Sequence, residues 1–513
     1  MHERERFLGL SPVTLVMIAG AAAKFALHLY MAPGYGYFFD ELYTLALSRH
    51  LAWGYVDLPP LVPALVALSR AVLGDTLLAL HIIPALAGAA TLVFVCLIAR
   101  EFGGKGFAVA LTALGFIAVP LWLSVDSIFC YDSIDQMVLA GFLYTLVRFL
   151  RTGNRRLWIG LGLIAGIACL TKMTILFLGP GFLVALLISG YRKDLLTPWP
   201  WLGALLCVVV VSPYLIWEIA NHWPTLEYWQ AYGTLRVYQA SVWQYLTNIS
   251  IYMSALLLPL WAAGLYRIFR RLDGVNYSFL GVLFLVTLAL LFALHASGRM
   301  IGETFMPLLA AGAVFAEETL SGLRWGTVGK AITVAYVLAA GVVVIPLALP
   351  ILPVDAFPSY ASTFKFLTPP LMEFNGSAST TMLLDGRRGW DDLVQAVANV
   401  YQALPAEDRA VAGIYGDSYA VAGAVDELGP RYGLPHAVSG MLTYYLWGPG
   451  YSWNVMIIIA GRTNPMSVFF NSCEKQADIA QDYGPAIGHP TIYVCRQPIV
   501  PAEKIWSSMK IYR

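Results

Sequence analysis

The most prominent pattern in the sequence is a series of long apolar runs between residue 11 and about residue 350. The runs have roughly 17 to 25 residues, the length that crosses a lipid bilayer as an α-helix. Polar residues and turn formers separate one run from the next. The pattern predicts eleven transmembrane helices, at 11–32, 77–99, 106–124, 132–150, 157–171, 173–190, 199–217, 248–267, 277–296, 303–320 and 327–348.

Basic residues at the ends of these predicted helices predict their orientation, because cytoplasmic ends carry the excess of Lys and Arg. Five basic residues flank one set of ends: Arg49, Arg70, Lys172, Arg236 and Arg299. Fifteen flank the other: Arg4, Arg6, Arg100, Lys105, Arg148, Arg151, Arg155, Arg156, Arg192, Lys193, Arg267, Arg270, Arg271, Arg324 and Lys330. We therefore expect a cytoplasmic N-terminus and, with an odd number of spans, a C-terminal region outside the cytoplasm. The first run is full length and lacks a small-residue cleavage site, so we expect no cleavable signal peptide.

Composition supports the membrane interpretation. Of 513 residues, 58% are hydrophobic and 12% are charged, about half the charged share of an average soluble domain. Lys and Arg (32) nearly balance Asp and Glu (31), so nothing indicates a surface for nucleic acid. The same numbers exclude a disordered chain and a small disulfide-stapled secreted domain.

The pattern changes after the last apolar run. Prolines punctuate a predicted linker over 351–375, which follows a transmembrane domain over 1–350. The remainder, 376–513, alternates helical spacing with short apolar strands, so we predict a small α/β domain. Within it we expect a helix over 391–404 and strands over 411–415, 455–460 and 491–495.

Two cysteines, Cys473 and Cys495, fall in this predicted exported domain. A disulfide between them is one interpretation, because oxidation is available outside the cytoplasm. A pair of free thiols is the other interpretation, and neither spacing resembles a metal site.

Charged residues are concentrated at the predicted outer membrane boundary. Inside the spans Lys24 is the main exception, and its aliphatic stem lets it snorkel to an interface. The first outer loop, 33–76, mixes aromatic and carboxylate residues, which is typical of helices lying along a membrane interface. The outer polar layer consists of Asp40, Glu41, Asp57, Asp126, Asp132, Asp135, Lys172, His222, Glu227, Arg299 and Glu303.

Asp40 and Glu41 are neighbours near a predicted helix start. Adjacent residues point about 100° apart on a helix, so both carboxylates can hardly face one site. One of them is expected to act in chemistry, while the other caps the helix or forms an ion pair. Taken alone, such an acidic pair matches the helix dipole without any catalytic role.

The order of several short motifs resembles bacterial glycosyltransferase family 39, the protein O-mannosyltransferase-like group that includes the lipid A aminoarabinose transferases. The chain has Leu58 where the family often has His or Gln, and Arg299-Met300-Ile301 where Lys often precedes an aromatic pair. The motifs are Asp40-Glu41, Tyr55-Val56-Asp57-Leu58-Pro59-Pro60-Leu61, Asp135-Gln136, Leu170-Thr171-Lys172, Trp223-Pro224-Thr225-Leu226-Glu227, Pro307-Leu308-Leu309-Ala310-Ala311-Gly312-Ala313, Gly433-Leu434-Pro435 and Leu446-Trp447-Gly448-Pro449.

The resemblance implies a GT-C fold in a bacterial inner membrane, and transfer of a sugar from a polyprenyl-phosphate donor to a lipid, glycan or protein acceptor on the periplasmic face. It implies that Asp40 is the catalytic base. The leaving group is an anionic phosphate, so cations should surround it. Arg299 is our first candidate and Lys172 our second, although both residue types also serve as interfacial anchors at span ends.

Further site residues follow with less specific roles. Asp135 supports the catalytic centre, binds sugar hydroxyls, or matches its helix dipole; Glu41 shares the catalytic assignment with Asp40. Inversion at the anomeric carbon is expected, because one base acts without a second carboxylate as nucleophile. Clamping by cations makes a divalent metal dispensable, so we expect no required cofactor and leave a metal open. Sugar or acceptor contacts are assigned to Tyr55, Asp57, His222 and Glu227.

Two other functions compete with this interpretation. A transporter or flippase for a lipid-linked sugar would use the outer charges as a gate, and a scaffold would present the C-terminal domain. The transporter would be expected to carry ionisable groups near the bilayer centre and inverted repeats, which the sequence lacks apart from Lys24. A scaffold needs no cluster of acids and cations. The main interpretation therefore requires that Asp40 and Arg299 face one common cavity.

Overall fold

The computed structural model describes residues 11–235, 240–367, 386–461, 465–481, 483 and 488–512. Contacts between residues divide the chain into two compact units. Unit 1 consists of Met1–Gly34, Leu78–Leu215 and Tyr238–Pro370, and unit 2 consists of Tyr35–Leu77, Ile216–Val237 and Leu371–Arg513. The sequence analysis predicted three consecutive segments with limits at 350 and 375, whereas each unit combines segments from separate parts of the chain. The predicted limits stay a prediction. Residues 368–385, at the end of the predicted linker and the start of the predicted C-terminal domain, lie outside the described residues, as do Arg4, Arg6 and Arg236.

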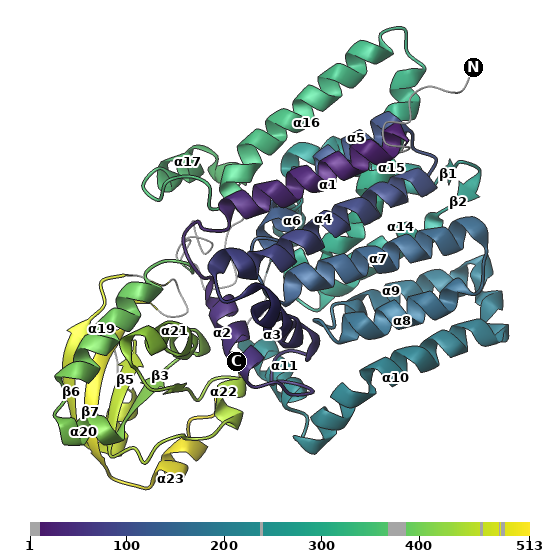
Figure 1. The fold of residues 1–513 in the computed structure, drawn as a ribbon. Coiled ribbons are helices and arrows are strands. Elements are labelled where there is room, and N and C mark those ends of the chain that lie inside the picture. Colours follow the sequence, from purple (N-terminus) through teal and green to yellow (C-terminus); the bar gives the residue numbers. More distant parts are fainter. Residues whose placement is uncertain are drawn as a thin grey trace. The chain divides into compact units, whose positions relative to one another are not determined.

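In its described residues unit 1 is helical apart from one short hairpin, and several of its helices lie side by side in Figure 1. It begins with α1 (Pro12–Met31), α4 (Leu77–Glu101), α5 (Gly106–Ile117), α6 (Pro120–Val125), α7 (Tyr131–Thr152), α8 (Leu157–Cys169), α9 (Ile175–Ile188), η1 (Gly190–Leu196) and most of α10 (Pro198–Ala220). It continues with α12 (Val242–Tyr252), η2 (Ala255–Leu257), α13 (Leu258–Ile268), β1 (Arg271–Leu272), β2 (Val275–Asn276), α14 (Ser278–Ala293), η3 (Gly298–Thr304), α15 (Phe305–Ser321), α16 (Gly326–Ala348), α17 (Phe357–Thr363) and η4 (Lys365–Leu367).

Each predicted span contains helix, but two of them are broken. The span predicted at 106–124 is divided into α5 and α6, with Pro120 opening the second helix because proline is favoured at a helix start. The span predicted at 248–267 bends by 94° between α12 and α13. By length and composition, six helices of the described chain can cross a membrane, or up to eight if each bent pair is one span. The predicted number of eleven is therefore not confirmed.

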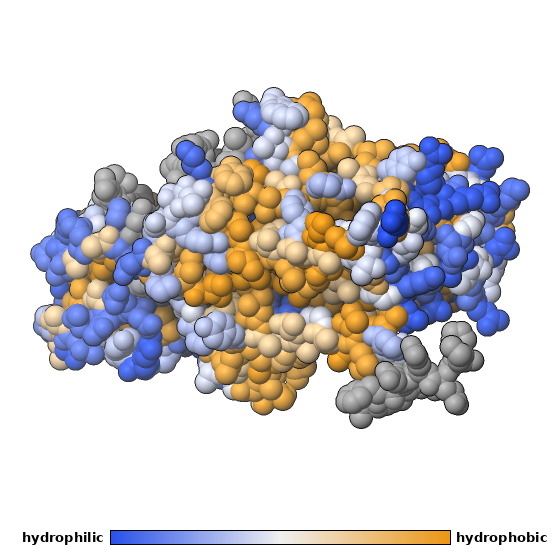
Figure 2. Space-filling view, turned by 90° about the horizontal axis from the view of Figure 1, so that it is seen from above, coloured by the Kyte–Doolittle hydropathy of each residue, from blue (hydrophilic) through white to orange (hydrophobic). Residues whose placement is uncertain are grey.

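Many large apolar side chains of unit 1 face outward. Figure 2 shows a broad hydrophobic area on the face in view, bordered by hydrophilic residues. An apolar surface of this kind is stable in lipid and would aggregate in water. On α10 and α16 the exposed apolar residues of this unit include Trp201, Leu205, Val208, Val328, Ile332 and Val342.

Lys24 of α1 does not snorkel to an interface, contrary to the prediction. Its Nζ lies 2.8 Å from Asp126 Oδ2, and both side chains are completely buried. Gln136 Nε2 donates to both oxygens of Asp126, at 3.1 and 3.2 Å. Gly88 of α4 provides the space, because an added Cβ would lie 2.3 Å from Asp126 Oδ2. The pair connects α1 to the segment between α6 and α7.

Replacing Lys24 with Met should destabilise the protein by about 3–5 kcal/mol, because it leaves the Asp126 carboxylate buried without its cation. The measurement is thermal unfolding of the purified protein in detergent. The double variant Lys24→Met/Asp126→Asn should recover most of the loss, since it buries no net charge. An unchanged unfolding temperature in the single variant would contradict the importance of the ion pair.

Unit 2 combines the first outer loop with a C-terminal α/β domain. The loop folds into two helices, as its composition predicts. Outside the α/β domain the helices are α2 (Phe39–Arg49), α3 (Leu61–Leu73) and α11 (Pro224–Leu235). The domain itself contains α19 (Trp390–Ala403), α20 (Ala406–Val411), β3 (Ala412–Gly416), α21 (Tyr419–Leu428), η5 (Gly429–Tyr432), β4 (Ala437–Val438), α22 (Thr443–Leu446), β5 (Val455–Ala460), η6 (Pro465–Phe469), β6 (Phe470–Asp478), β7 (Thr491–Pro498) and α23 (Ala502–Ser507).

The sheet of this domain is mixed, with strand order β4-β3-β5-β7-β6. Strands β4, β3 and β5 run parallel, whereas β7 is antiparallel to both of its neighbours. The fully buried β3 and β5 are continuous apolar runs, as expected for strands covered on both faces. The predicted helix and all three predicted strands are present, and the α/β class is confirmed.

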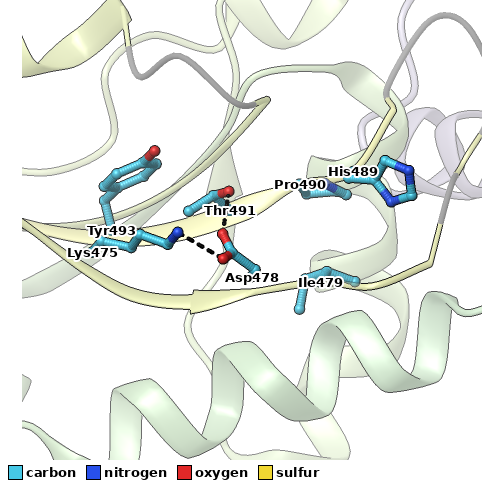
Figure 3. A pocket seen from close by; sticks show the side chains of 7 residues that line it. All are labelled: Lys475, Asp478, Ile479, His489, Pro490, Thr491 and Tyr493. Carbon is cyan, nitrogen blue, oxygen red and sulfur yellow. Dashed lines mark hydrogen bonds and ion pairs between the residues drawn. The ribbon is translucent and has the colours of Figure 1, made fainter.

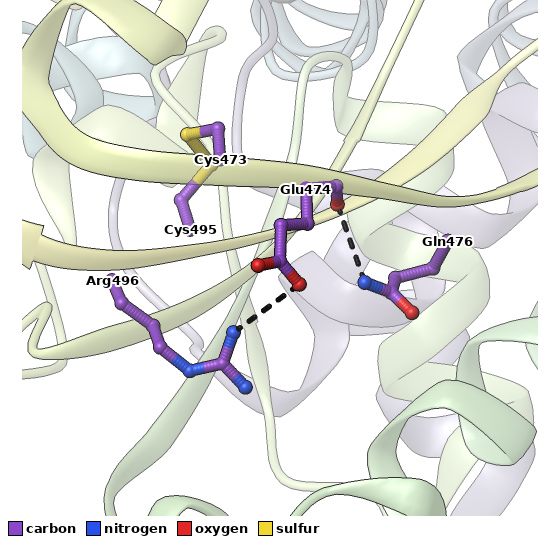
Figure 4. Close-up of a disulfide and its surroundings, with 5 residues drawn as sticks. All are labelled: Cys473, Glu474, Gln476, Cys495 and Arg496. Atoms are coloured by element: carbon purple, nitrogen blue, oxygen red, sulfur yellow. Dashed lines mark hydrogen bonds and ion pairs between the residues drawn. A yellow bond between two sulfur atoms is a disulfide. The ribbon is translucent and has the colours of Figure 1, made fainter.

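Cys473 and Cys495 form a disulfide, the first of the two interpretations offered by the sequence. They are directly opposite each other on β6 and β7 (Figure 4). Arg496, next to Cys495, reaches across the same strand pair to within 4.0 Å of Glu474. The bond therefore links the edge strand β6 covalently to its neighbour β7.

Candidate functional site

The first candidate site lies in unit 1, where three polar segments surround a small cavity. Asp132 lies in the first turn of α7, and Asp135 follows three residues later, on a neighbouring position of the same helix face. Lys172 occupies the turn between α8 and α9, and Arg299 lies in η3. The cavity measures about 30 Å³ and is lined by Leu121, Val125, Asp132, Lys172, Thr174, Arg299, Met300 and Glu303.

Contacts within this cluster hold two of its carboxylates, those of Asp132 and Asp135. Lys172 forms an ion pair with Asp132, and its Nζ lies 5.1 Å from the centre of the Tyr131 ring. Thr171 donates a hydrogen bond of 2.7 Å to Asp135 Oδ1. Asp135 is buried, whereas about a fifth of the Lys172 side chain (21%) is exposed. An incoming anion can therefore reach Lys172, and Arg299, which is also partly exposed, lines the same cavity.

The cavity also borders one carboxylate whose hydrogen bonding is incomplete among the described residues. Glu303 Oε2 is buried and has no hydrogen-bond partner among the described residues. A buried oxygen without a partner costs free energy, so such atoms point to water or a ligand. The cavity has room for one or two water molecules and not for a sugar. Binding of anything larger requires these side chains to move.

The second candidate site lies in unit 2, at the start of α2. Glu41 is buried, and its Oε2 accepts a 2.8 Å hydrogen bond from the backbone N–H of Phe38. This is the capping role that the sequence left open for one member of the acidic pair. Asp40 points elsewhere: its Oδ1 accepts a 2.9 Å hydrogen bond from the hydroxyl of Tyr419. The two neighbouring carboxylates therefore have different partners, and the catalytic role of Asp40 stays a prediction.

Asp57 belongs to the same group of side chains. The hydroxyl of Tyr43 donates a 2.7 Å hydrogen bond to Asp57 Oδ1. Burial raises the pKa of Asp57 to about 7, with a smaller contribution from the negative charge of Asp40, while the Tyr43 hydrogen bond opposes the rise. Unit 2 thus brings together two of the predicted site residues, Asp40 and Asp57.

Three other predicted residues have contacts of their own. Tyr55 is buried, and its hydroxyl accepts a hydrogen bond from the N–H of Ala52 at 3.1 Å. Glu227 forms an ion pair with Lys510, with 2.6 Å between Oε2 and Nζ. His222 is exposed in the turn between α10 and α11. No described contact brings these residues to Asp40, and their roles stay predictions.

Unit 1 likewise brings together Asp135, Lys172 and Arg299, whose roles stay predictions. Asp40 and Arg299 belong to different units, so the common cavity expected for them stays a prediction. The sequence assigned no role to Asp132, Glu303 or Tyr419. The three-residue spacing from Asp135 could have revealed Asp132, and the four-residue spacing from Arg299 could have revealed Glu303. No sequence signal connects Tyr419 with Asp40, because 379 residues separate them.

A metal was left open for these carboxylates. Over the described part of the chain, no group of three or more His, Cys, Asp and Glu side chains is arranged to hold a metal ion. The Asp132 carboxylate is already paired with Lys172. We derive no step through a metal, and the expectation of no required cofactor stays a prediction.

A larger open cavity of about 480 Å³ lies on the α/β domain, beside β6 and β7 (Figure 3). Its main polar contacts are an ion pair of 2.6 Å between Lys475 and Asp478 and a 2.9 Å hydrogen bond from Thr491 to Asp478. Lys475 and Asp478 are both well exposed to solvent. None of the predicted site residues lines this cavity, so we assign no chemistry to it.

Comparisons with known proteins agree with the architecture. Residues 57–217 match the family model of dolichyl-phosphate-mannose-protein mannosyltransferases. No curated protein matches the sequence. Two crystal structures of ArnT from Cupriavidus metallidurans, bound to undecaprenyl phosphate and in the apo state, align with a TM-score of 0.57 at 15% and 14% identity. Both alignments cover 94% of this chain and 97% of the ArnT chain.

The Archaeoglobus fulgidus oligosaccharyltransferase in its apo form aligns more weakly, with a TM-score of 0.47 and 14% identity over 79% of this chain and 60% of that chain. At these identities a structural likeness shows the fold alone, and the ArnT alignment extends over nearly the whole chain. The family match includes Asp57, Asp135 and Lys172. Residues 57–217 are thus similar to the dolichyl-phosphate-mannose-protein mannosyltransferases, and nearly the whole chain shares the fold of ArnT.

Proposed function

We propose that the protein transfers a sugar from a polyprenyl-phosphate donor to a lipid, glycan or protein acceptor on the periplasmic face of a bacterial inner membrane. The observation that carries the proposal is the cavity of unit 1, where Lys172 and Arg299 lie beside three carboxylates. ArnT, which shares the fold, has been crystallised with undecaprenyl phosphate. A cationic pair at the polar edge of apolar helices suits the phosphate of such a lipid.

When the donor binds, its phosphate would take the place of a carboxylate beside Lys172. Lys172 is paired with Asp132 in the structure. The donor phosphate replaces Asp132 as the partner of Lys172, while the forked guanidinium of Arg299 binds a second phosphate oxygen. The carboxylates of Asp132 and Asp135 then become acceptors for sugar hydroxyls. This exchange supplies the side-chain movement that the small cavity requires.

The transfer step breaks the bond between the anomeric carbon and the phosphate oxygen. The electron pair leaves with the polyprenyl phosphate, whose charge the two cations stabilise. The acceptor oxygen forms the new bond from the opposite face, which inverts the anomeric carbon. When the acceptor is a hydroxyl, its proton goes to Asp40 as general base. When the acceptor is a phosphate, which is already ionised, Asp40 orients it.

A transporter or flippase of a lipid-linked sugar is the second candidate. The buried Lys24–Asp126 pair favours it, because paired charges inside a membrane protein mark ion and substrate pathways. However, both members are enclosed and hydrogen-bonded, an arrangement that also suits a purely structural ion pair.

One assay separates the two functions. The purified full chain in detergent is incubated with mannosyl or aminoarabinosyl undecaprenyl phosphate and with a lipid A glycolipid, an oligosaccharide or a Ser/Thr peptide. A transferase releases undecaprenyl phosphate and raises the acceptor mass by one sugar, which mass spectrometry detects. Detergent micelles have no two sides, so a flippase gives no product there. Movement of the donor across proteoliposomes without any transfer would overturn the proposal.

A further inference from the structure

The α/β domain and the first outer loop are packed together within unit 2. Helices α2 and α21 lie in direct contact (Figure 1). At Gly423 of α21, an added Cβ would lie 2.8 Å from the carbonyl oxygen of Leu42. Arg49 at the end of α2 forms a 2.7 Å ion pair with Glu427 of α21. The two backbones therefore approach as closely as a glycine permits.

The contact between α2 and α21 includes a hydrogen bond to Asp40, the proposed base. Tyr419, the first residue of α21, donates its hydroxyl to Asp40 Oδ1 at 2.9 Å, and its ring lies 4.8 Å from the ring of Tyr43. Burial, with the Asp40 charge in second place, raises the pKa of Tyr419 well above its usual range. The hydroxyl therefore stays protonated at physiological pH and keeps donating.

A second contact from the same domain holds the neighbouring carboxylate. The hydroxyls of Thr443 and Tyr43 are 2.9 Å apart, and the backbone N–H of Val56 donates to Thr443 Oγ1 at 3.0 Å. Tyr43 in turn donates to Asp57. Residues from the other end of the chain thus contact Asp40 directly, through Tyr419, and Asp57 indirectly, through Thr443 and Tyr43.

We propose that the C-terminal α/β domain is the positioning element of the catalytic base, with Tyr419 fixing one oxygen of Asp40 so that the other faces the acceptor. This inference rests on the proposed function, in which Asp40 takes the acceptor proton. Tyr419 acts through Asp40 and touches no substrate. A base held in one orientation needs no reorganisation at the moment of attack.

The test is Tyr419→Phe in the purified full chain, assayed with the undecaprenyl-phosphate sugars and acceptors named above. Loss of a hydrogen bond to a charged acceptor should lower kcat about 10- to 100-fold, while the KM for the donor stays unchanged. The matched control is Tyr401→Phe, because the Tyr401 hydroxyl donates to Arg409 within the domain and away from Asp40. That control should retain wild-type kcat.

Gly423→Ala tests the domain contact separately. The new methyl group should push α21 away from α2, lower kcat as Tyr419→Phe does, and speed amide hydrogen exchange in α2. Wild-type kcat in either variant, or a raised donor KM at unchanged kcat, would overturn the inference. Such results leave the proposed function standing as long as Asp40→Asn abolishes transfer; full transfer by Asp40→Asn would instead remove the proposed function itself.

Discussion

Replacing Asp40 with Asn is expected to lower kcat for a hydroxyl acceptor by about 10²- to 10⁴-fold, the usual contribution of a general base. Asn keeps the shape of the side chain and can still accept the Tyr419 hydrogen bond. The variant therefore removes the proton acceptor and leaves the arrangement of α2 intact. Transfer rates and donor KM, measured by mass spectrometry of the acceptor, check the result.

The size of the effect also identifies the acceptor. A phosphate acceptor needs no deprotonation, so Asp40→Asn should then cost much less than with a hydroxyl. Asp355→Asn is the matched control, because it removes the same charge from an exposed residue that precedes α17 in the sequence. Full activity of Asp40→Asn with a hydroxyl acceptor would exclude Asp40 as the base.

Arg299→Ala is expected to reduce kcat/KM for the donor by about 10²- to 10³-fold, the loss typical of removing one donor to a developing anion. Arg299 lines the cavity with Lys172, and truncation leaves one cation for the phosphate. Both a higher donor KM and a lower kcat are expected, because the phosphate is bound in the ground state and gains charge during the reaction.

Two further variants make this test specific. Arg299→Lys keeps the charge but loses the forked geometry, so its activity should lie between wild type and Arg299→Ala. Arg324→Ala removes an exposed basic residue at a different helix end of unit 1 and should behave as wild type. An unchanged donor KM in Arg299→Ala would argue against the phosphate clamp and leave Arg299 as an interfacial anchor.

Much of the fold follows from local pattern. Apolar runs predict helices that the structure contains, and short apolar runs after residue 390 predict β3, β5 and β7. The breaks were not foreseen: α5 ends before Pro120, and the chain turns by 94° between α12 and α13. The mean hydropathy of a segment indicates whether it is buried in lipid or protein. It does not change when an apolar run bends, so the breaks could not be predicted from it.

The site was predictable in its residue types and only partly in its contacts. Lys172, Arg299 and Asp135 were expected together because each lies at the same predicted end of its helix. Helix spacing left open which of Asp40 and Glu41 acts in chemistry, and only the family resemblance favoured Asp40. The capping role depends on which side chain turns back to the N–H of Phe38, and helix spacing alone does not decide that.

The sequence by itself determined the membrane-embedded helices, the α/β class of the C-terminal domain and the acids and cations available for chemistry, because hydrophobic periodicity and residue type are local properties. Only the tertiary structure decided that Lys24 is buried against Asp126 and that Tyr419 holds Asp40. These contacts join residues roughly a hundred and nearly four hundred positions apart. Such pairs form through the packing of whole helices, and no local pattern records them.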